Sequence, residues 1–301
     1  MTKLSREDTI TYAKTGSILV VILLIFLIWL WWARVYTSKS NVFNAMLSNS
    51  LSTYGVTKTV SQDDENGKLT QISQAQFGAQ NVVEIKTDIT QPAENGDVKV
   101  TTQTLATPTE DLVRYSSIDM PASEGKQKID FTPLFADWGK TDKAEGGGAP
   151  FSEAIFGIVP FGNLPTTQRN QLLSIMHGKN VYKTDYSKTE VKNEAGRTVY
   201  VYKVDVNLQG YAELLKAYDA MLGLKQMEQL NPEDYASSDP IKATMTVDKL
   251  SRNLVKITYD NDGREEALGG YGIHKSIDIP TESISRQELE TKLQELLNPE
   301  Q

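Results

Sequence analysis

The residues that could carry catalysis or bind a metal are few and widely separated in this chain. The two histidines, His177 and His274, have no metal-ligand partner at a useful spacing. Cysteine is absent, which removes disulfides, thiol nucleophiles, cysteine-ligated zinc and iron–sulfur clusters together. His177 precedes Gly178 at an expected helix end, where the helix dipole favours an imidazole for purely structural reasons. These residues predict neither a catalytic nor a metal site.

Two short motifs contain residue types that could do chemistry but lie in an unsuitable context. Ser123 and Lys126 match the S-x-x-K pattern, which needs a helical turn to bring the lysine to the serine. Here a proline precedes the motif and a glycine lies inside it, so we expect a solvated loop. Residues 260–263 resemble a calcium loop, but in that register Thr258 and Gly269 replace the first and last acidic ligands. We therefore expect a hairpin turn, no metal, no cofactor, and a protein that is not an enzyme.

Overall charge and composition restrict the partners. The formal net charge is −8, which argues against a nucleic-acid partner because such a partner needs a basic face. The 301 residues have an ordinary apolar content. They are sufficient for one large folded domain or two small ones.

The most distinctive segment is residues 16–33, GSILVVILLIFLIWLWWA, which contains no charged residue. As a helix it rises about 27 Å, close to the roughly 30 Å hydrocarbon core of a bilayer. Its far end contains Trp29, Trp31 and Trp32, and Arg34 comes directly after it. These side chains are bulky where signal-peptide cleavage needs small ones, and they suit the headgroup region. A cleaved signal peptide and a buried core helix are the alternatives. The aromatic end and the lack of a polar stripe favour a retained transmembrane helix with these four residues at the membrane interface.

The charges around this segment indicate its orientation. Three basic side chains precede it, whereas Arg34 and Lys39 follow it, and this asymmetry favours a cytoplasmic N-terminus. We expect residues 1–15 to be a short cytoplasmic tail and residues 34–40 a short tether. Residues 41–301 would then be extracytoplasmic, tied to the cytoplasmic membrane by a single-pass signal anchor.

Beyond the anchor, strand patterns joined by turn signals dominate. Residues 81–90 and 97–107 flank Asn95-Gly96, a hairpin signal, and residues 110–119 and 270–280 are further strand candidates. Few helical patterns separate adjacent strands, which points to an α+β fold with an antiparallel sheet. Three consecutive glycines predict a flexible loop over residues 136–150.

The boundaries follow from these patterns. Residues 41–282 form one expected antiparallel α+β domain, beginning with helical spacing of apolar residues over 41–54. Residues 283–301 form a C-terminal helix and tail, because Ser285 and Glu288 make a capping box ahead of a leucine stripe.

One apolar segment, residues 151–165, is interrupted by helix breakers and lies beside the glycine-rich loop. It is interpreted either as ordinary core packing or as a flap over an apolar cavity, since pockets for apolar ligands need apolar walls and a gate. The strand candidate over 197–208, RTVYVYKVDVNL, would line the same cavity with its apolar face. The ligand-cavity candidates are Ile155, Phe156, Ile158, Val159, Phe161, Tyr200, Tyr202 and Val204.

The order of elements and the late strand pair TMTVDKLSRNLVKITYD, with Val247-Asp248 and Val255-Lys256-Ile257, resemble the LolA/LppX-like lipoprotein carrier superfamily. The resemblance implies a curved, half-barrel-like antiparallel sheet that cups an apolar cavity closed by helices. It implies a binding domain for a lipid or other apolar ligand. The alternative is a non-catalytic scaffold with a filled core that contacts a protein partner in the cell envelope.

Overall fold

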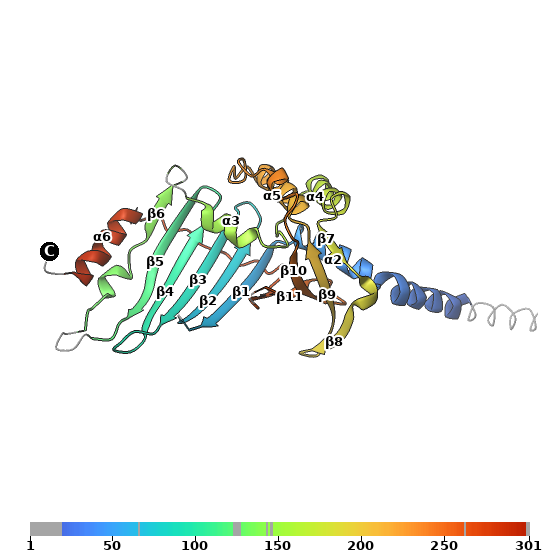
Figure 1. Cartoon of the computed structure of the whole chain (residues 1–301), viewed down its shortest axis with the longest axis horizontal. Helices are drawn as coiled ribbons and strands as arrows, with labels where there is room; N and C mark the ends of the chain where they lie inside the picture. Colours follow the sequence, from blue (N-terminus) through green and yellow to red (C-terminus); the bar gives the residue numbers. More distant parts are fainter. Residues whose placement is uncertain are drawn as a thin grey trace, which may run out of the picture.

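The computed structural model describes residues 20–65, 67–122, 128–142, 144, 147–261 and 263–298. The strands in these ranges form one continuous open sheet in the order β13-β6-β5-β4-β3-β2-β1-β12-β11-β10-β9-β7, and β8 also pairs with β9 (Figure 1). Neighbouring strands are antiparallel except for β13 and β6, which are parallel. The predicted α+β class is confirmed, and the predicted purely antiparallel sheet is wrong at this pair, which makes the sheet mixed.

The sheet has a distal half and a proximal half, which meet where β1 pairs with β12. The distal half contains β1 (Gly55–Asp64), β2 (Gly67–Gln76), β3 (Val82–Gln91), β4 (Val98–Ala106), β5 (Glu110–Asp119), β6 (Gly139–Asp142) and β13 (Ile284–Ser285). The proximal half, nearer the N-terminal helix, contains β7 (Tyr182–Thr184), β8 (Glu190–Glu194), β9 (Arg197–Val206), β10 (Ile241–Asp248), β11 (Leu254–Tyr259) and β12 (Glu265–Gly269). The helices of the domain are α2 (Lys39–Ser50), α3 (Ala149–Ile155), α4 (Thr166–Gly178), α5 (Leu208–Leu222) and α6 (Arg286–Leu297), with short turns η2 (Thr132–Leu134), η4 (Tyr186–Lys188) and η5 (Pro232–Tyr235).

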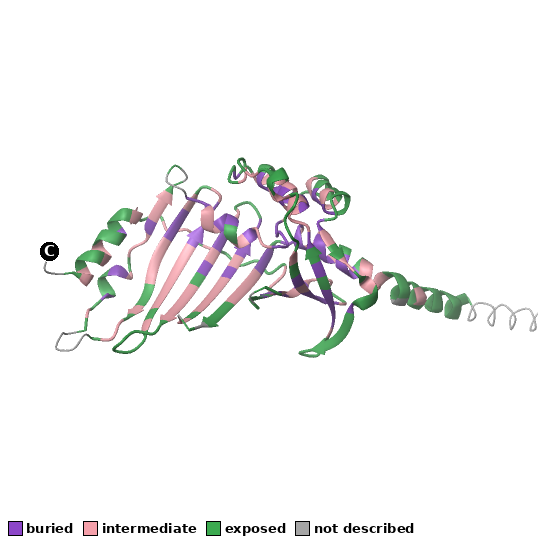
Figure 2. Ribbon diagram, viewed as in Figure 1, coloured by how far each residue is buried: buried purple, intermediate pink, exposed green. Residues whose placement is uncertain are grey.

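The proximal half is packed on one face by α2, α4 and α5. Residues Val42, Phe43, Met46 and Leu47 give α2 an apolar face at helical spacing, and all four are buried. In β9 the sequence VYVYKVDV places apolar residues on both faces, and most of its residues are buried. These elements supply most of the main hydrophobic core, which Figure 2 shows as purple segments.

The distal half has much less cover. The helix α3 crosses one face of β2–β5 near the ends of the strands, and this face is called the front face (Figure 1). Leu105 and Ala106, at the end of β4, are buried on opposite faces of the sheet, with Ala106 on the α3 side, whereas the rest of β4 is half-buried or exposed. The middle of these strands is correspondingly pink and green rather than purple in Figure 2.

The opposite face of the distal half is crossed by an irregular segment, residues 270–283, and the prediction of a strand over 270–280 is therefore wrong. Gly270 and Gly272 have φ angles of 63° and 70°, which take the backbone out of the extended conformation that a strand requires. Polar contacts hold the segment to the sheet. Lys275 donates from Nζ to Gln74 Oε1 at 2.9 Å and to Glu84 Oε2 at 2.8 Å. The segment carries the chain to β13 and α6 at the far edge.

The predicted loop over 136–150 also contains regular structure. Its residues 139–142 form the edge strand β6, and α3 begins at Ala149, while residues 143, 145 and 146 lie outside the described residues. The strand GKTD has no apolar alternation, so its pattern could not indicate it. Gly139 allows α6 to pack closely on this strand, since a Cβ there would lie 2.8 Å from Leu289 Cδ2 and 3.1 Å from Leu289 Cβ. The helix α6 begins as predicted, with Glu288 N–H donating to Ser285 Oγ at 3.1 Å.

The expected tether over 34–40 is mostly helical. The N-terminal helix (Val20–Tyr36) ends in a π-helical turn, η1 (Trp32–Tyr36), and α2 starts three residues later. In the described residues, no single helix has both the length and the hydropathy to cross a membrane. The N-terminal helix and α2 reach that threshold only as a pair, bent by 71°. Residues 16–19 of the predicted transmembrane segment lie outside the described residues.

Candidate functional site

The predicted ligand-cavity residues lie in or against the main hydrophobic core. Seven of them are buried, and Phe156 packs against the same cluster while remaining partly exposed. Tyr200 and Tyr202 donate hydrogen bonds from their hydroxyls to the carbonyls of Thr37 and Lys39, each at 2.8 Å. Their positions fit the core-packing interpretation of these residues, because protein atoms surround them.

The segment that follows α3 is fastened by three tyrosines. Tyr182 donates to the carbonyl of Ile158 at 2.6 Å and Tyr211 to that of Gly157 at 2.7 Å, while Tyr218 donates to Phe161. Burial raises the pKa of Tyr182, Tyr211 and Tyr218 above the ordinary value of 10, so the hydroxyls remain protonated donors. The segment is therefore an integral part of the core.

The uncovered part of the front face has an ordered arrangement that the strand register defines. Directly paired residues on adjacent strands point to the same face, so rows of side chains cross the sheet. The polar row consists of Gln71, Thr87 and Thr102. The apolar row lies one step further from α3 and consists of Leu69, Ile89, Val100 and Ile118. All members of the apolar row are half-buried, and together the two rows form the open face.

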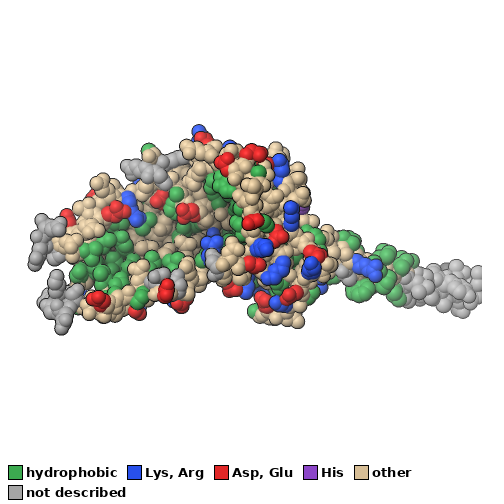
Figure 3. Space-filling model, in the orientation of Figure 1, with side chains coloured by type: hydrophobic (Ala, Val, Ile, Leu, Met, Phe, Trp, Pro, Cys, Tyr) green, Lys and Arg blue, Asp and Glu red, His purple; other side chains and the backbone are tan. Residues whose placement is uncertain are grey.

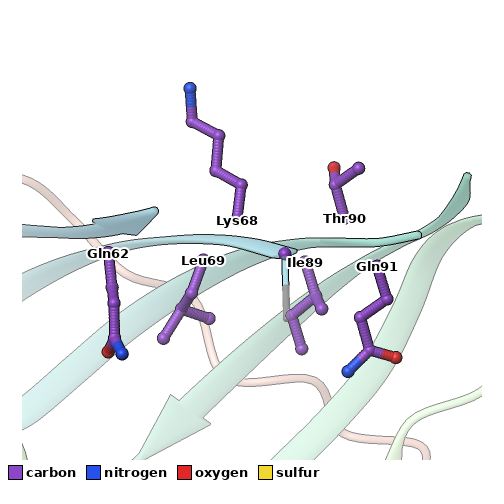
Figure 4. Close-up of a pocket in the computed structure, with 7 residues that line it drawn as sticks. Gln62, Lys68, Leu69, Ile89, Thr90 and Gln91 are labelled. Atoms are coloured by element: carbon purple, nitrogen blue, oxygen red, sulfur yellow. The ribbon is translucent and has the colours of Figure 1, made fainter. Parts of the chain in front are cut away.

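One end of the apolar row forms a depression of about 250 Å³. Figure 4 shows Gln62, Leu69, Ile89 and Gln91 directed to the same side of the sheet, with Lys68 and Thr90 directed to the other. Leu69 and Ile89 form the apolar floor of the depression, and Gln62 and Gln91 supply amide groups at its rim. This composition suits an apolar group flanked by a few polar ones.

At its other end the apolar row runs into a second apolar cluster. Phe131, Leu134 of η2 and Leu289 of α6 are buried there against one another. Partly buried apolar side chains surround these three: Tyr115, Ile118, Met120, Ile129, Phe135, Ile284, Leu293, Leu296 and Leu297. A green apolar area accordingly appears on the distal end of the molecule in Figure 3. Ile118 belongs to both groups, so the open face and this cluster form one continuous apolar surface.

Charged groups lie at the proximal end of the front face. Lys58 of β1 pairs in register with Ser73 on one side and with Leu268 on the other, and its pKa is lowered mainly by burial, against the opposing attraction of Glu266. Glu266 is buried and accepts a hydrogen bond from the Tyr259 hydroxyl at 3.0 Å. The front face thus carries the apolar row across β2–β5 and charged groups on β1 and β12, at the seam between the halves.

The helix α3 is attached to the sheet through a buried carboxylate. Asp111 of β5 accepts a hydrogen bond from the Gly148 N–H at 2.8 Å, and Gly148 has a φ of 90°. Burial raises the pKa of Asp111 above 3.8, although the Gly148 bond and Arg286 act in the opposite direction. This contact joins the N-terminal end of α3 to β5.

The residues singled out for catalysis are not brought together. His177 is exposed at the end of α4, and His274 is exposed in the segment behind the sheet rather than in a strand. Ser123 and Lys126 lie outside the described residues. In the described ranges, no three His, Asp or Glu side chains gather in a geometry that could hold a metal ion.

The predicted membrane-interface residues lie on the N-terminal helix. Trp29, Trp31, Trp32 and Arg34 are exposed, as are the aliphatic side chains before them. The sequence patterns did not single out Arg252, which fastens this helix to the domain. Its guanidinium lies 3.3 Å from the ring centroid of Tyr36 and donates to the Tyr36 carbonyl at 2.9 Å. Only the folded chain brings these two residues together, so no local pattern could indicate the contact.

The apolar row was also absent from the sequence-based candidates. Each of its members is a single apolar residue among threonines, glutamines and lysines, and only the register of four strands places them side by side. Strand alternation could indicate which face each residue occupies, but not which residues are neighbours.

Comparison with known proteins gives one solved structure of interest. The sequence matches no model of a known protein family and no curated protein. The crystal structure of LprF from Mycobacterium bovis is similar at 12% sequence identity, over 80% of this chain and 96% of that one, with a TM-score of 0.36. At that level of agreement we take no function, ligand or family membership from the likeness.

Proposed function

We propose that this protein is a membrane-anchored, non-catalytic binding protein whose open face holds a lipid or another apolar ligand. The observation that carries the proposal is the apolar row, a set of half-buried aliphatic side chains that the described elements leave uncovered. Contact of these aliphatic side chains with water is unfavourable. Its free-energy cost is about 25 cal/mol per Å² of exposed apolar surface. A bound apolar molecule would remove that surface from water.

The dimensions of the apolar row favour a hydrocarbon chain. Three strand-to-strand spacings separate Leu69 from Ile118, which corresponds to roughly 14 Å. One leaflet of a bilayer hydrocarbon core is about 15 Å thick, and an acyl chain of a membrane lipid spans it. A single acyl chain lying across the strands would therefore cover the row. The polar row beside it offers hydroxyl and amide groups to a polar part of the same ligand.

The N-terminal helix supplies the second part of the proposal. Its exposed aliphatic side chains and its aromatic end support an anchor in the cytoplasmic membrane, with the N-terminus inside and residues 41–301 extracytoplasmic. A lipid-binding face attached to such an anchor would act on lipids close to the membrane of origin.

Photo-crosslinking tests the ligand and its position together. The full chain is reconstituted in phospholipid vesicles that contain a trace of phospholipid with a diazirine in its acyl chain, and the sites of attachment are mapped by peptide mass spectrometry after irradiation. We expect adducts on β2, β3 and β4 in addition to adducts on residues 20–36. Adducts confined to the anchor would contradict lipid binding on the open face.

Two substitutions on one strand give a matched control. Ile89→Asp places a charge in the apolar row and should remove the adducts from β2–β4. Thr90→Asp places the same charge on the next residue, directed to the other side of the sheet, and should leave them unchanged (Figure 4). Equal loss in both variants would show that the adducts depend on strand stability rather than on the open face.

The scaffold alternative is supported by the filled core of the proximal half. If the open face collects no lipid adduct and an organic extract of the purified chain contains no other apolar compound, the scaffold function is favoured instead. The domain would then serve to contact an envelope protein.

A further inference from the structure

The connection between the N-terminal helix and the domain is a fixed junction. Besides its contacts with Tyr36, Arg252 has a φ of 56°, a left-handed conformation that is unfavourable for a residue with a Cβ. Such conformations persist where the surroundings impose them. The hydroxyls of Tyr200 and Tyr202 hold the next residues of the chain through the carbonyls of Thr37 and Lys39. The helix and the proximal half are therefore joined by several independent contacts.

Arg252 belongs to the turn between β10 and β11, residues 249–253, and this turn is itself rigidly built. Asp248 accepts hydrogen bonds at Oδ1 from the backbone N–H of Leu250 at 2.9 Å and of Ser251 at 2.7 Å. The carbonyl of Thr198 accepts from the Lys249 N–H at 3.0 Å, which ties the turn to β9. An Asx-capped turn of this kind holds its outermost side chain in a defined position.

The outermost side chain of the turn is a leucine. Leu250 is 59% exposed, with Lys249 before it and Arg252 two residues after it. The aromatic ring of Tyr36, on which Arg252 lies, also stacks on Trp32 at 4.4 Å between centroids. Trp32 and Tyr36 belong to the aromatic end of the anchor, which suits the headgroup layer. Leu250 and Lys249 thus belong to the turn whose Arg252 contacts this aromatic end of the helix.

We propose that the β10–β11 turn is a second, peripheral contact with the membrane, in which Leu250 enters the interface and Lys249 faces anionic headgroups, with Arg252 positioning the turn. The inference rests on the proposed anchor. An exposed leucine beside a lysine is a side-chain combination of interfacial segments, since the apolar group enters the acyl boundary while the cation remains near the phosphates. Two contacts would hold the domain in one orientation on the bilayer.

Spin labelling provides the test, because the natural chain contains no cysteine that would compete for the label. Three single-cysteine variants of the full chain are labelled with a nitroxide: Leu250→Cys, Ile25→Cys on the anchor and Ile273→Cys behind the sheet. Ile25 and Ile273 are similarly exposed, at 61% and 63%. Each variant is reconstituted in vesicles of phosphatidylcholine and phosphatidylglycerol. Accessibility to oxygen and to a water-soluble nickel chelate is then measured by power saturation.

We expect the oxygen-to-nickel accessibility ratio at position 250 to exceed that at 273 several-fold and to approach that at 25. If the label at position 250 has the same accessibility ratio as the label at 273, while the label at 25 lies in lipid, the membrane contact of the turn is contradicted but the anchor is not. A water-exposed label at all three positions overturns both.

A further substitution separates the role of Arg252 from that of the turn. Arg252→Gly removes the guanidinium, while glycine accepts the left-handed φ without strain, so the turn can keep its shape. Combined with Leu250→Cys, it should lower the accessibility ratio at 250 several-fold and leave the ratio at 25 unchanged. An unchanged ratio at 250 overturns the positioning role of Arg252.

Discussion

The two halves of the sheet share one hydrogen-bonded ladder but differ in how their side chains are covered. In β9 the sequence VYVYKVDV leaves few residues outside the core, because α2, α4 and α5 cover one face and several residues on the other are buried as well. In β4 the sequence VKVTTQTLA buries only its last two residues, of which Ala106 lies on the α3 side and Leu105 on the opposite face. The strands are similar in length, so the difference lies in composition and in what packs on them.

This difference shows that the backbone ladder and the hydrophobic core are separate contributions to a sheet. The pairing of β2 with β3 and of β3 with β4 satisfies their backbone groups over nine positions per pair without a continuous core above them. Threonine and glutamine side chains tolerate such partial exposure, and β-branched threonine also suits the extended backbone. A half of this kind can keep its fold while it leaves an apolar row available to a ligand.

Matched leucine truncations should show the largest contrast between the halves. Leu254 of β11 is fully buried and Leu69 of β2 is half-buried. Leu254→Ala should lower the free energy of unfolding by about 2–5 kcal/mol through the lost contacts and the cavity left behind. Leu69→Ala should cost about 1 kcal/mol or less, because solvent already reaches the site. Denaturant titration measures both, and equal losses would mean that the open face is as tightly packed as the core.

Local sequence signals explain how far the fold could be predicted. The patterns over 41–54, 81–90, 97–107 and 110–119 correspond to α2, β3, β4 and β5, because helical spacing, β-branched strand residues and the Asn95-Gly96 turn signal mark these elements. Where such signals were absent or misleading, the prediction failed. The strand β6 was expected to be loop, and residues 270–280 were expected to be strand although they cross the back of the sheet.

The candidate site was harder to predict for a related reason. The apolar segment 151–165 is conspicuous in the sequence because its apolar residues are contiguous. In the structure most of these apolar residues pack in the main hydrophobic core. The apolar row is spread over four strands with one residue in each, and its existence depends on pairing register. The Arg252–Tyr36 contact joins residues that are distant in the chain. Local spacing carries no information on either feature.

Substitutions that affect the packing of α3 on the distal half should have the next largest effect on stability. Gly148→Ala would introduce a Cβ at a φ of 90°, 2.6 Å from the Pro108 carbonyl oxygen, at a cost of roughly 1–3 kcal/mol. Amide hydrogen exchange should then accelerate in α3 and remain unchanged in β9–β11. Gly196→Ala, in the β8–β9 turn, has a φ of 77° but open space around it. It should cost about 1 kcal/mol from backbone strain alone. Unchanged exchange in α3 would show that Gly148 does not control its attachment.

The contribution of Asp111 to the attachment of α3 should make the free energy of unfolding depend on pH. Because burial raises the pKa of Asp111 in the folded chain above 3.8, the unfolded chain loses this proton first as the pH rises. The stabilising contribution of Asp111 is complete below pH 3.8 and is lost as the pH rises through the folded-state pKa. Asp111→Asn keeps an oxygen acceptor for Gly148 N–H and cannot ionise. The free energy of unfolding of the variant, relative to the natural chain, should therefore rise across that window, and parallel profiles would contradict the assignment.

The smallest effect should come from the back of the distal half. Lys275 joins the irregular segment to Glu84 at 2.8 Å, but its side chain is 52% exposed, so solvent screens the pair. Lys275→Met removes the charge and keeps most of the length, and it should cost about 0.2–1 kcal/mol, less at high salt. Denaturant titrations at low and high salt would measure this. A cost near that of Leu254→Ala would mean that the back face is a packed layer of its own, because only burial could give one surface lysine such an energy. A small, salt-dependent cost would instead indicate that the distal half is held mainly by its backbone ladder, its cover by α3 and its edge cluster under α6.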